Sequence, residues 1–277
     1  MLTIEKTVLM SPEQMQMVIE GMRNPKNSWD RSDSAIEHIE DPGTMQTADW
    51  QFHLGETDHE LMRTLAAGGS VHAKYRRMMT VMATINGPLY WWKEFDTYKV
   101  GTVSNGCSIM HTIHAKPFDI SDFSCEHLFR LGKNVGFDEL PIYNGERWDA
   151  LFVLEIVIKS LNHYRSAFLE TKDKRYWWQL IQLLPYSYNQ KRTVMLNYEV
   201  LSRIYADRHD HKLDEWRGFC DWISKLPYAD LLIPENANIM DISEELMTVN
   251  ELREKLGLER VEDVSFIGNI EEEPNNE

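Results

Sequence analysis

The sequence predicts an α+β fold with more helix than strand, and three observations support this. Apolar residues recur at helical spacing over about 146–170, which indicates a long amphipathic helix. Residues 79–86 alternate instead, with Val81, Ala83 and Ile85 on one side, as in a half-buried strand. Of the 277 residues, 43% are hydrophobic and 26% are charged, which is the composition of a globular protein.

Capping and breaker signals place the other elements in order. A strand over 3–10 precedes a helix that ends near residue 23, and a capping box from Ser11 to Gln14 opens that helix. A second capping box, formed by Thr57 and Glu60, predicts a helix that stops at two glycines. Further helices are expected at about 89–97, 174–184, 190–205 and 213–224, and loops at 24–49 and 99–114.

The composition changes at Pro234 and divides the chain into two parts. The sequence predicts one α+β domain over residues 1–233. It predicts a C-terminal extension over 234–277 that holds a short helix and an acidic, disordered tail.

The net charge of −15, from 29 basic and 44 acidic residues, excludes several partners. Polymeric nucleic acid and anionic membrane surfaces both require an excess of Lys and Arg. No apolar run approaches the length of a membrane span, and the N-terminus is too polar for a signal peptide. The three cysteines form no C-x-x-C pair, and His209-Asp210-His211 alone is a weak metal motif. We therefore expect a cytoplasmic protein without a metal site.

Common catalytic motifs are absent, but two segments in a fixed order carry a resemblance. The first segment begins at the end of a strand, over residues 85–90, and continues into a short helix. It then contains the triplet position at 97–99 and ends at Cys107 or Ser108. The second begins at Leu184-Pro185 and continues through Asn197 and Arg208 to the run His211-Lys212-Leu213-Asp214-Glu215-Trp216-Arg217. Together they resemble the flavin-dependent thymidylate synthases over roughly residues 1–225.

This resemblance implies a fold, a reaction and a set of ligands. The fold is an antiparallel sheet flanked by long helices, in a homotetramer whose sites lie between subunits. The reaction methylates or otherwise modifies C5 of dUMP or a related pyrimidine mononucleotide. FAD supplies a hydride, methylene-tetrahydrofolate is the carbon donor and NADPH is the expected reductant.

The resemblance also implies site residues. Arg208 and Ser108 are the catalytic candidates, because a cation and a donor at the ring oxygens stabilise the charge that makes C5 nucleophilic. The candidates for cofactor binding are Tyr98, Lys99, Asn197, Arg203 and His211. The candidates for substrate binding are Lys93, Glu94, Asn105 and Cys107.

Several of these residues have structural alternatives. Arg208 also suits a helix C-terminus, where it would interact with the macrodipole. Asn197 also suits a helix surface, and His211 also suits the loop before a helix. Cys107 and Ser108 lie in a polar loop, where such residues often form turns or caps.

The sequence departs from the family at its arginines. The first Arg of the triplet is Thr97 or Tyr98 here, and other arginines become Ile109 or Met110, Ile181 and Glu199. The basic residues that are candidates to replace them are Lys93, Lys99, Arg76, Arg77, Lys191, Arg192 and Arg203. Three hypotheses follow: an enzyme of this type, a non-catalytic ligand-binding or interaction protein with the same fold, and an unrelated α+β enzyme.

Overall fold

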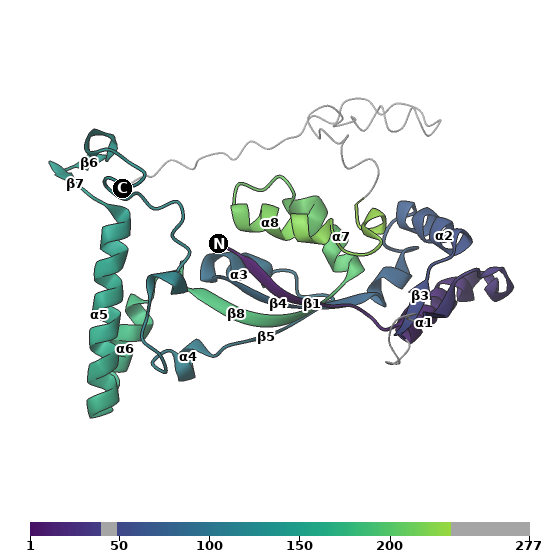
Figure 1. Ribbon diagram of the computed structural model, residues 1–277, viewed down its shortest axis with the longest axis horizontal. Coiled ribbons are helices and arrows are strands. Elements are labelled where there is room, and N and C mark those ends of the chain that lie inside the picture. The colour runs from purple at the N-terminus through teal and green to yellow at the C-terminus, as the bar shows by residue number, and fades with distance from the viewer. Residues whose placement is uncertain (40–48, 234–277) are drawn as a thin grey trace, which may run out of the picture. The chain divides into compact units, whose positions relative to one another are not determined.

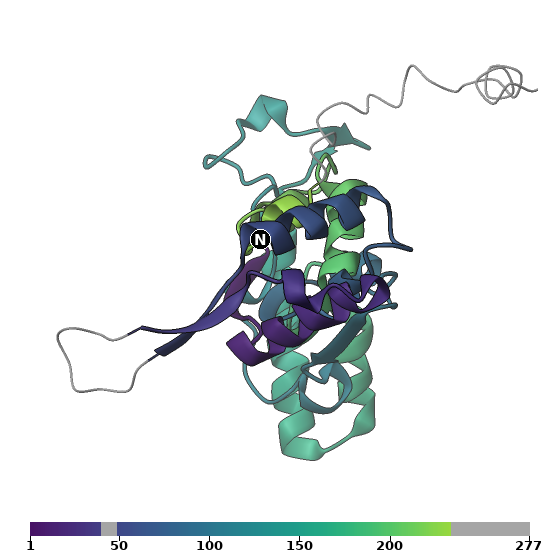
Figure 2. The ribbon, with the colours of Figure 1, turned by 90° about the vertical axis from the view of Figure 1, so that its right-hand side faces the viewer.

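The computed structural model describes residues 1–39 and 49–233, and its architecture is α+β (Figure 1). A four-stranded antiparallel sheet has the order β1-β4-β8-β5. Its strands are β1 (Thr3–Val8), β4 (Thr80–Pro88), β8 (Asn189–Asn197) and β5 (Thr102–Gly106). Two smaller antiparallel sheets pair β2 (Ala35–Ile39) with β3 (Asp49–His53) and β6 (Ile142–Tyr143) with β7 (Glu146–Arg147). Figure 2 shows β2 and β3 extending away from the helices.

Eight α-helices lie within the described ranges. They are α1 (Pro12–Arg23), α2 (Glu56–Ala67), α3 (Leu89–Phe95), α4 (Ile109–Thr112), α5 (Ala150–Thr171), α6 (Lys174–Leu183), α7 (Tyr198–Arg208) and α8 (Asp214–Ile223). The capping box at the start of α1 is confirmed: the Ser11 side chain accepts from the Gln14 backbone, and Gln14 accepts from the Ser11 backbone. None of the described helices is long and apolar enough to cross a membrane.

The main core lies between one face of the sheet and helices α3, α7 and α8, which Figure 1 shows together on that side. Trp91, Trp92 and Trp216 are fully buried in this core and pack on one another and on neighbouring phenylalanines. The alternation predicted for 79–86 is confirmed, because Val81, Ala83 and Ile85 all face this core. A second cluster joins α5 and α6 to residues 113–123, with Leu161 and Leu180 at its centre.

The opposite face of the sheet carries a row of exposed apolar side chains. Val8 pairs with Met82, Met82 pairs with Met195, and Met195 pairs with Val103, so the row crosses all four strands. These side chains are between 36% and 59% exposed. We refer to these four residues as the apolar row.

Three expectations about local structure are wrong. Residues 190–205 are not one helix, because β8 occupies 189–197 and α7 begins only at Tyr198. Thr57 does not cap α2; the helix begins after Gly55, and the Asp33 carboxylate accepts from the Thr57 backbone instead. The expected loop at 24–49 contains β2, and the expected loop at 99–114 contains β5 and α4. The predicted extension over 234–277 lies outside the described residues.

Candidate functional site

Three predicted site residues, Glu94, Tyr98 and His211, meet around a fourth, Arg208. Its Nε donates to the Tyr98 hydroxyl at 2.9 Å, and its Nη1 donates to Glu94 Oε2 at 3.1 Å. Trp216 Nε1 donates to the same Glu94 oxygen at 2.9 Å, and His211 Nε2 lies 3.8 Å from it. We refer to Glu94, Tyr98, Arg208, His211 and Trp216 as the Arg208 cluster.

Three helices hold the Arg208 cluster in place. Glu94 lies on α3, Arg208 is the last residue of α7, and Trp216 lies on α8. The Arg208 guanidinium lies 4.9 Å from the centroid of the Trp216 ring and 5.8 Å from that of Tyr98, which adds cation–π attraction. The Arg208 side chain is 22% exposed. The cluster therefore presents a partly buried, well-oriented cation beside open solvent.

Tyr98 stays protonated in this environment. Burial raises the pKa of its phenol above the usual value, and this outweighs the opposing effect of the adjacent Arg208. The hydroxyl accepts from Arg208 and donates to Asp207 Oδ2 at 3.3 Å. Tyr98 is therefore a neutral hydrogen-bonding link between an acid and a base on α7.

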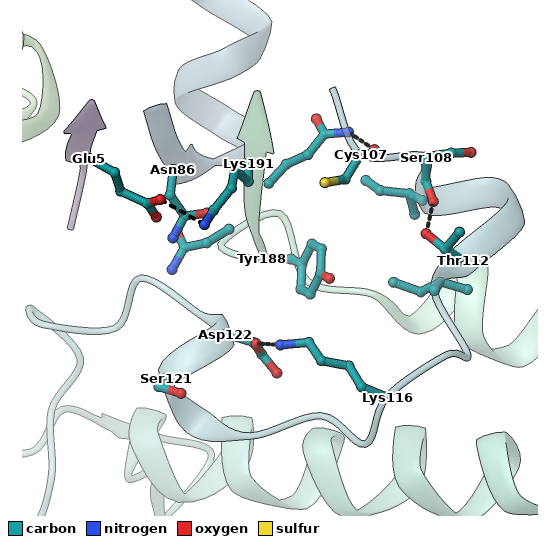
Figure 3. Close-up of a pocket in the computed structure, with 14 residues that line it drawn as sticks. Glu5, Asn86, Cys107, Ser108, Thr112, Lys116, Ser121, Asp122, Tyr188 and Lys191 are labelled. Carbon is teal, nitrogen blue, oxygen red and sulfur yellow. Dashed lines mark hydrogen bonds and ion pairs between the residues drawn. The ribbon is translucent and has the colours of Figure 1, made fainter. Parts of the chain in front are cut away.

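Cys107 and Ser108 line a polar pocket, drawn in Figure 3, with a cavity volume of about 350 Å³. Asn86 and Lys191 face it from paired positions on β4 and β8, on the side of the sheet opposite the main core. Lys191 Nζ forms an ion pair with Glu5 at 2.7 Å. We refer to this cavity as the Cys107 pocket.

The far wall of the Cys107 pocket comes from a segment without a sequence motif. Lys116 and Asp122 form an ion pair there, and Tyr188 lies between them and the sheet (Figure 3). The pocket has the size of a small-molecule site. Sequence reasoning missed Lys116 and Asp122, because a lysine and an aspartate six residues apart in an irregular segment give no periodic signal.

The polar loop residues in this pocket also have local structural roles. Ser108 is the N-cap of α4 and accepts from the His111 backbone at 3.2 Å. The Cys107 backbone carbonyl accepts from the Gln190 side chain at 2.5 Å, and the Cys107 residue is exposed.

The remaining predicted residues lie apart from both sites or at their edges. Arg203 is 75% exposed and makes a loose ion pair with Asp207 at 3.7 Å. The Lys93 Nζ atom lies 5.9 Å from the ring centroid of Tyr186. Lys99 is exposed on the turn after Tyr98, and Asn105 is exposed on the edge strand β5. A single protomer therefore places the candidates in two regions on opposite faces of the sheet.

Asn197 is the N-cap of α7, where its Oδ1 accepts from the Val200 backbone at 2.9 Å. Replacing Asn197 with alanine is expected to lower the free energy of unfolding by about 1 kcal/mol, because one backbone donor loses its partner. Asn197→Asp keeps the acceptor and is the matched control, with near-native stability expected. Urea denaturation without ligand measures both variants, and an equal loss in the two would contradict the capping role.

In the described part of the chain, no group of three or more His, Cys, Asp or Glu side chains is arranged to hold a metal ion.

Comparison with known proteins identifies the fold. Thymidylate synthase X from Helicobacter pylori with FAD and dUMP has a TM-score of 0.51 at 13% identity, over 85% of this chain and 97% of that one. A second H. pylori ThyX structure with FAD and dUMP has a TM-score of 0.52 at 15% identity, over 85% and 98%. A UMP/dUMP methylase, PolB from Streptomyces cacaoi bound with 5-Br dUMP, has a TM-score of 0.46 at 12% identity, over 86% and 93%.

At the level of sequence, neither a family profile nor a curated protein matches the chain. The two H. pylori comparisons cover most of both chains, so the likeness extends over the sheet and the helices around it. The chain therefore has the α+β fold of the flavin-dependent thymidylate synthases.

Proposed function

We propose that the chain is a flavin-dependent enzyme that modifies C5 of dUMP or a related pyrimidine mononucleotide. The observation that carries the proposal is the Arg208 cluster. It brings together Glu94 and Tyr98 from the first resembling segment with Arg208 and His211 from the second. The fold similarity supports the same conclusion, because both H. pylori structures contain FAD and dUMP.

The hydrogen bonds of Arg208 support a role for this residue in activating C5. Its Nε and Nη1 are held by Tyr98 and Glu94, while its Nη2 makes no hydrogen bond to any described residue. A pre-oriented donor of this kind stabilises charge that develops on a ring oxygen of the pyrimidine. We propose that Arg208 Nη2 performs this role.

Two exposed cations near the edge of the cluster support the binding of a flavin dinucleotide. A pyrophosphate requires cationic donors, and Lys99 and Arg203 are exposed cations in the segments that also supply Tyr98 and Arg208. We propose that these two residues, with Tyr98, Asn197 and His211, hold FAD. When bound, the flavin supplies the hydride, while methylene-tetrahydrofolate and NADPH are the proposed carbon donor and reductant.

A second copy of the chain would complete the site. Ser108 and the proposed substrate residue Cys107 lie on the opposite face of the sheet from Arg208, as does Asn105 by its register on β5. Substrate residues Lys93 and Glu94 lie on α3. We propose a homo-oligomer, of tetrameric form in this family, in which one protomer's Cys107 pocket faces another protomer's Arg208 cluster. The apolar row is the surface that we propose for a subunit contact.

Two observations favour the alternative of a non-catalytic ligand-binding or interaction protein. Glu94 neutralises Arg208 at 3.1 Å, and Glu199 replaces a family arginine with the opposite charge. A site without enough cationic donors would bind a nucleotide phosphate weakly.

Absorbance and ligand-induced stabilisation distinguish the two functions. The enzyme hypothesis predicts that the purified protein shows flavin absorption bands, or that its melting temperature rises on addition of FAD. It further predicts conversion of dUMP in the presence of methylene-tetrahydrofolate and NADPH. A colourless protein without stabilisation by FAD would refute the flavoenzyme. Flavin binding without conversion of dUMP or UMP would favour the binding protein.

A further inference from the structure

A second pocket lies between the end of α1 and the start of α2, and it shares no residue with the two regions described above. Its cavity volume is about 600 Å³. The residues that give it its chemistry are Arg23, Lys26, Asp30, Arg31 and Glu60. We refer to it as the α1–α2 pocket.

Arg23 forms a buried, incompletely paired part of the pocket wall. Its side chain is only 3% exposed. Nε donates to Asp58, and Nη1 donates to the Ser28 backbone oxygen at 3.1 Å and to Ser28 Oγ at 3.3 Å. Nη2 is buried and has no hydrogen-bond partner among the described residues. Because buried polar groups are nearly always paired, this nitrogen indicates a place for an acceptor atom.

Two further cations line the same pocket without partners. Lys26 and Arg31 are exposed, and neither forms an ion pair with a described residue. The chain has 44 acidic residues against 29 basic ones, so unpaired cations that share one pocket go against the overall charge. They give the pocket two unpaired cationic side chains that suit an oxyanion such as phosphate, and Arg23, whose charge Asp58 compensates, adds the unpaired donor Nη2.

The pocket also contains two unpaired carboxylates. Asp30 and Glu60 line it, and neither forms an ion pair within the described ranges. Carboxylates repel a free phosphate but accept hydrogen bonds from hydroxyl groups, as they do from ribose in dinucleotide sites. A ligand that carries both a phosphate and hydroxyl groups matches both sets of side chains.

We propose that the α1–α2 pocket binds a sugar phosphate or the sugar-phosphate part of a larger molecule. Arg23, Lys26 and Arg31 contact the phosphate, and Asp30 and Glu60 accept from the sugar hydroxyls. This site is independent of the flavin and nucleotide site proposed above, because it involves none of the same residues.

Calorimetric titration of the full chain with ribose 5-phosphate tests the proposal. Saturable binding is expected, and Lys26→Gln and Arg31→Gln are each expected to weaken it about tenfold, since each removes a charge-assisted contact. Lys225→Gln, which changes an exposed lysine outside the pocket, is the matched control and should bind as the native chain does.

Glu60→Gln tests whether the carboxylates bind the sugar part of the ligand rather than its phosphate. It is expected to weaken binding of ribose 5-phosphate while leaving the affinity for inorganic phosphate unchanged or higher, because a repulsive charge is removed. Circular dichroism confirms that each variant is folded. Absence of saturable binding, or native affinity in both Lys26→Gln and Arg31→Gln, would overturn the proposal. Equal weakening of both probes by Glu60→Gln would overturn the role of the carboxylates.

Discussion

Replacing Asp58 with alanine is expected to lower the free energy of unfolding by about 3–5 kcal/mol, because it leaves the buried Arg23 guanidinium without its counter-ion. The Asp58 side chain is 0% exposed and that of Arg23 is 3% exposed. Asp58 Oδ2 also accepts from the hydroxyls of Ser32 and Ser34, each at 2.7 Å. The substitution therefore also removes the partners that fix the segment before β2. The midpoint of urea denaturation, at unchanged m-value, measures the loss.

Two variants show whether the effect belongs to the buried charge. Asp30→Ala changes an exposed, unpaired aspartate and is expected to shift stability by no more than about 0.5 kcal/mol. The double variant Arg23→Met with Asp58→Leu removes both charges and should recover a large part of the loss, since neither is then left unpaired. A loss below about 1 kcal/mol in Asp58→Ala would mean that water solvates Arg23 in the native state.

The sequence predicted the elements whose signals are local. α1 begins at its capping box, β4 shows its alternation, and α6 ends one residue earlier than expected, before a proline. The start of α5 moved from 146 to Ala150, because Asp149 accepts from the Phe152 backbone as the N-cap and the preceding residues pair in β7.

The strand β8 was missed because its pattern depends on tertiary contacts. Val194 and Leu196 face the core, but the next core-side position along the strand is Arg192. The guanidinium of Arg192 lies 4.3 Å from the centroid of the Trp92 ring and forms an ion pair with Asp96 at 2.7 Å. An arginine that packs on a buried tryptophan breaks the alternation of polar and apolar residues, so the sequence pattern indicated a helix.

The candidate site shows the same difference between what local sequence predicts and what tertiary contacts determine. The resemblance predicted Glu94 and Arg208 as site residues. Their contact joins α3 to α7 across 114 positions of sequence, and no local pattern reveals such a contact. Trp216, whose indole completes the cluster, lies in the resembling run and was not among the predicted site residues. The sequence thus predicted candidate site residues, but tertiary packing determines which of their side chains are in contact.

Replacing Arg208 with lysine is expected to reduce turnover of the pyrimidine nucleotide by about 10²–10³-fold, if the proposed enzyme function is right. A lysine ammonium has no planar fork, so it cannot contact Tyr98 and Glu94 and still present a fixed donor to the ring oxygen. Steady-state kinetics measure the change. Arg175→Gln, which removes an exposed arginine on α6 outside both candidate regions, is the matched control and should retain native turnover.

The flavin readout distinguishes the electrostatic role of Arg208 from a structural one. Binding of FAD by Arg208→Lys at native affinity, together with the loss of turnover, would place Arg208 at the reacting ring. Loss of FAD binding in the same variant would instead indicate that Arg208 mainly holds α3, α7 and α8 together through Glu94, Tyr98 and Trp216. Native turnover would contradict both roles. Because Glu94 already offsets the charge of Arg208, the proposed role depends on the orientation of Nη2 rather than on the net charge of the site.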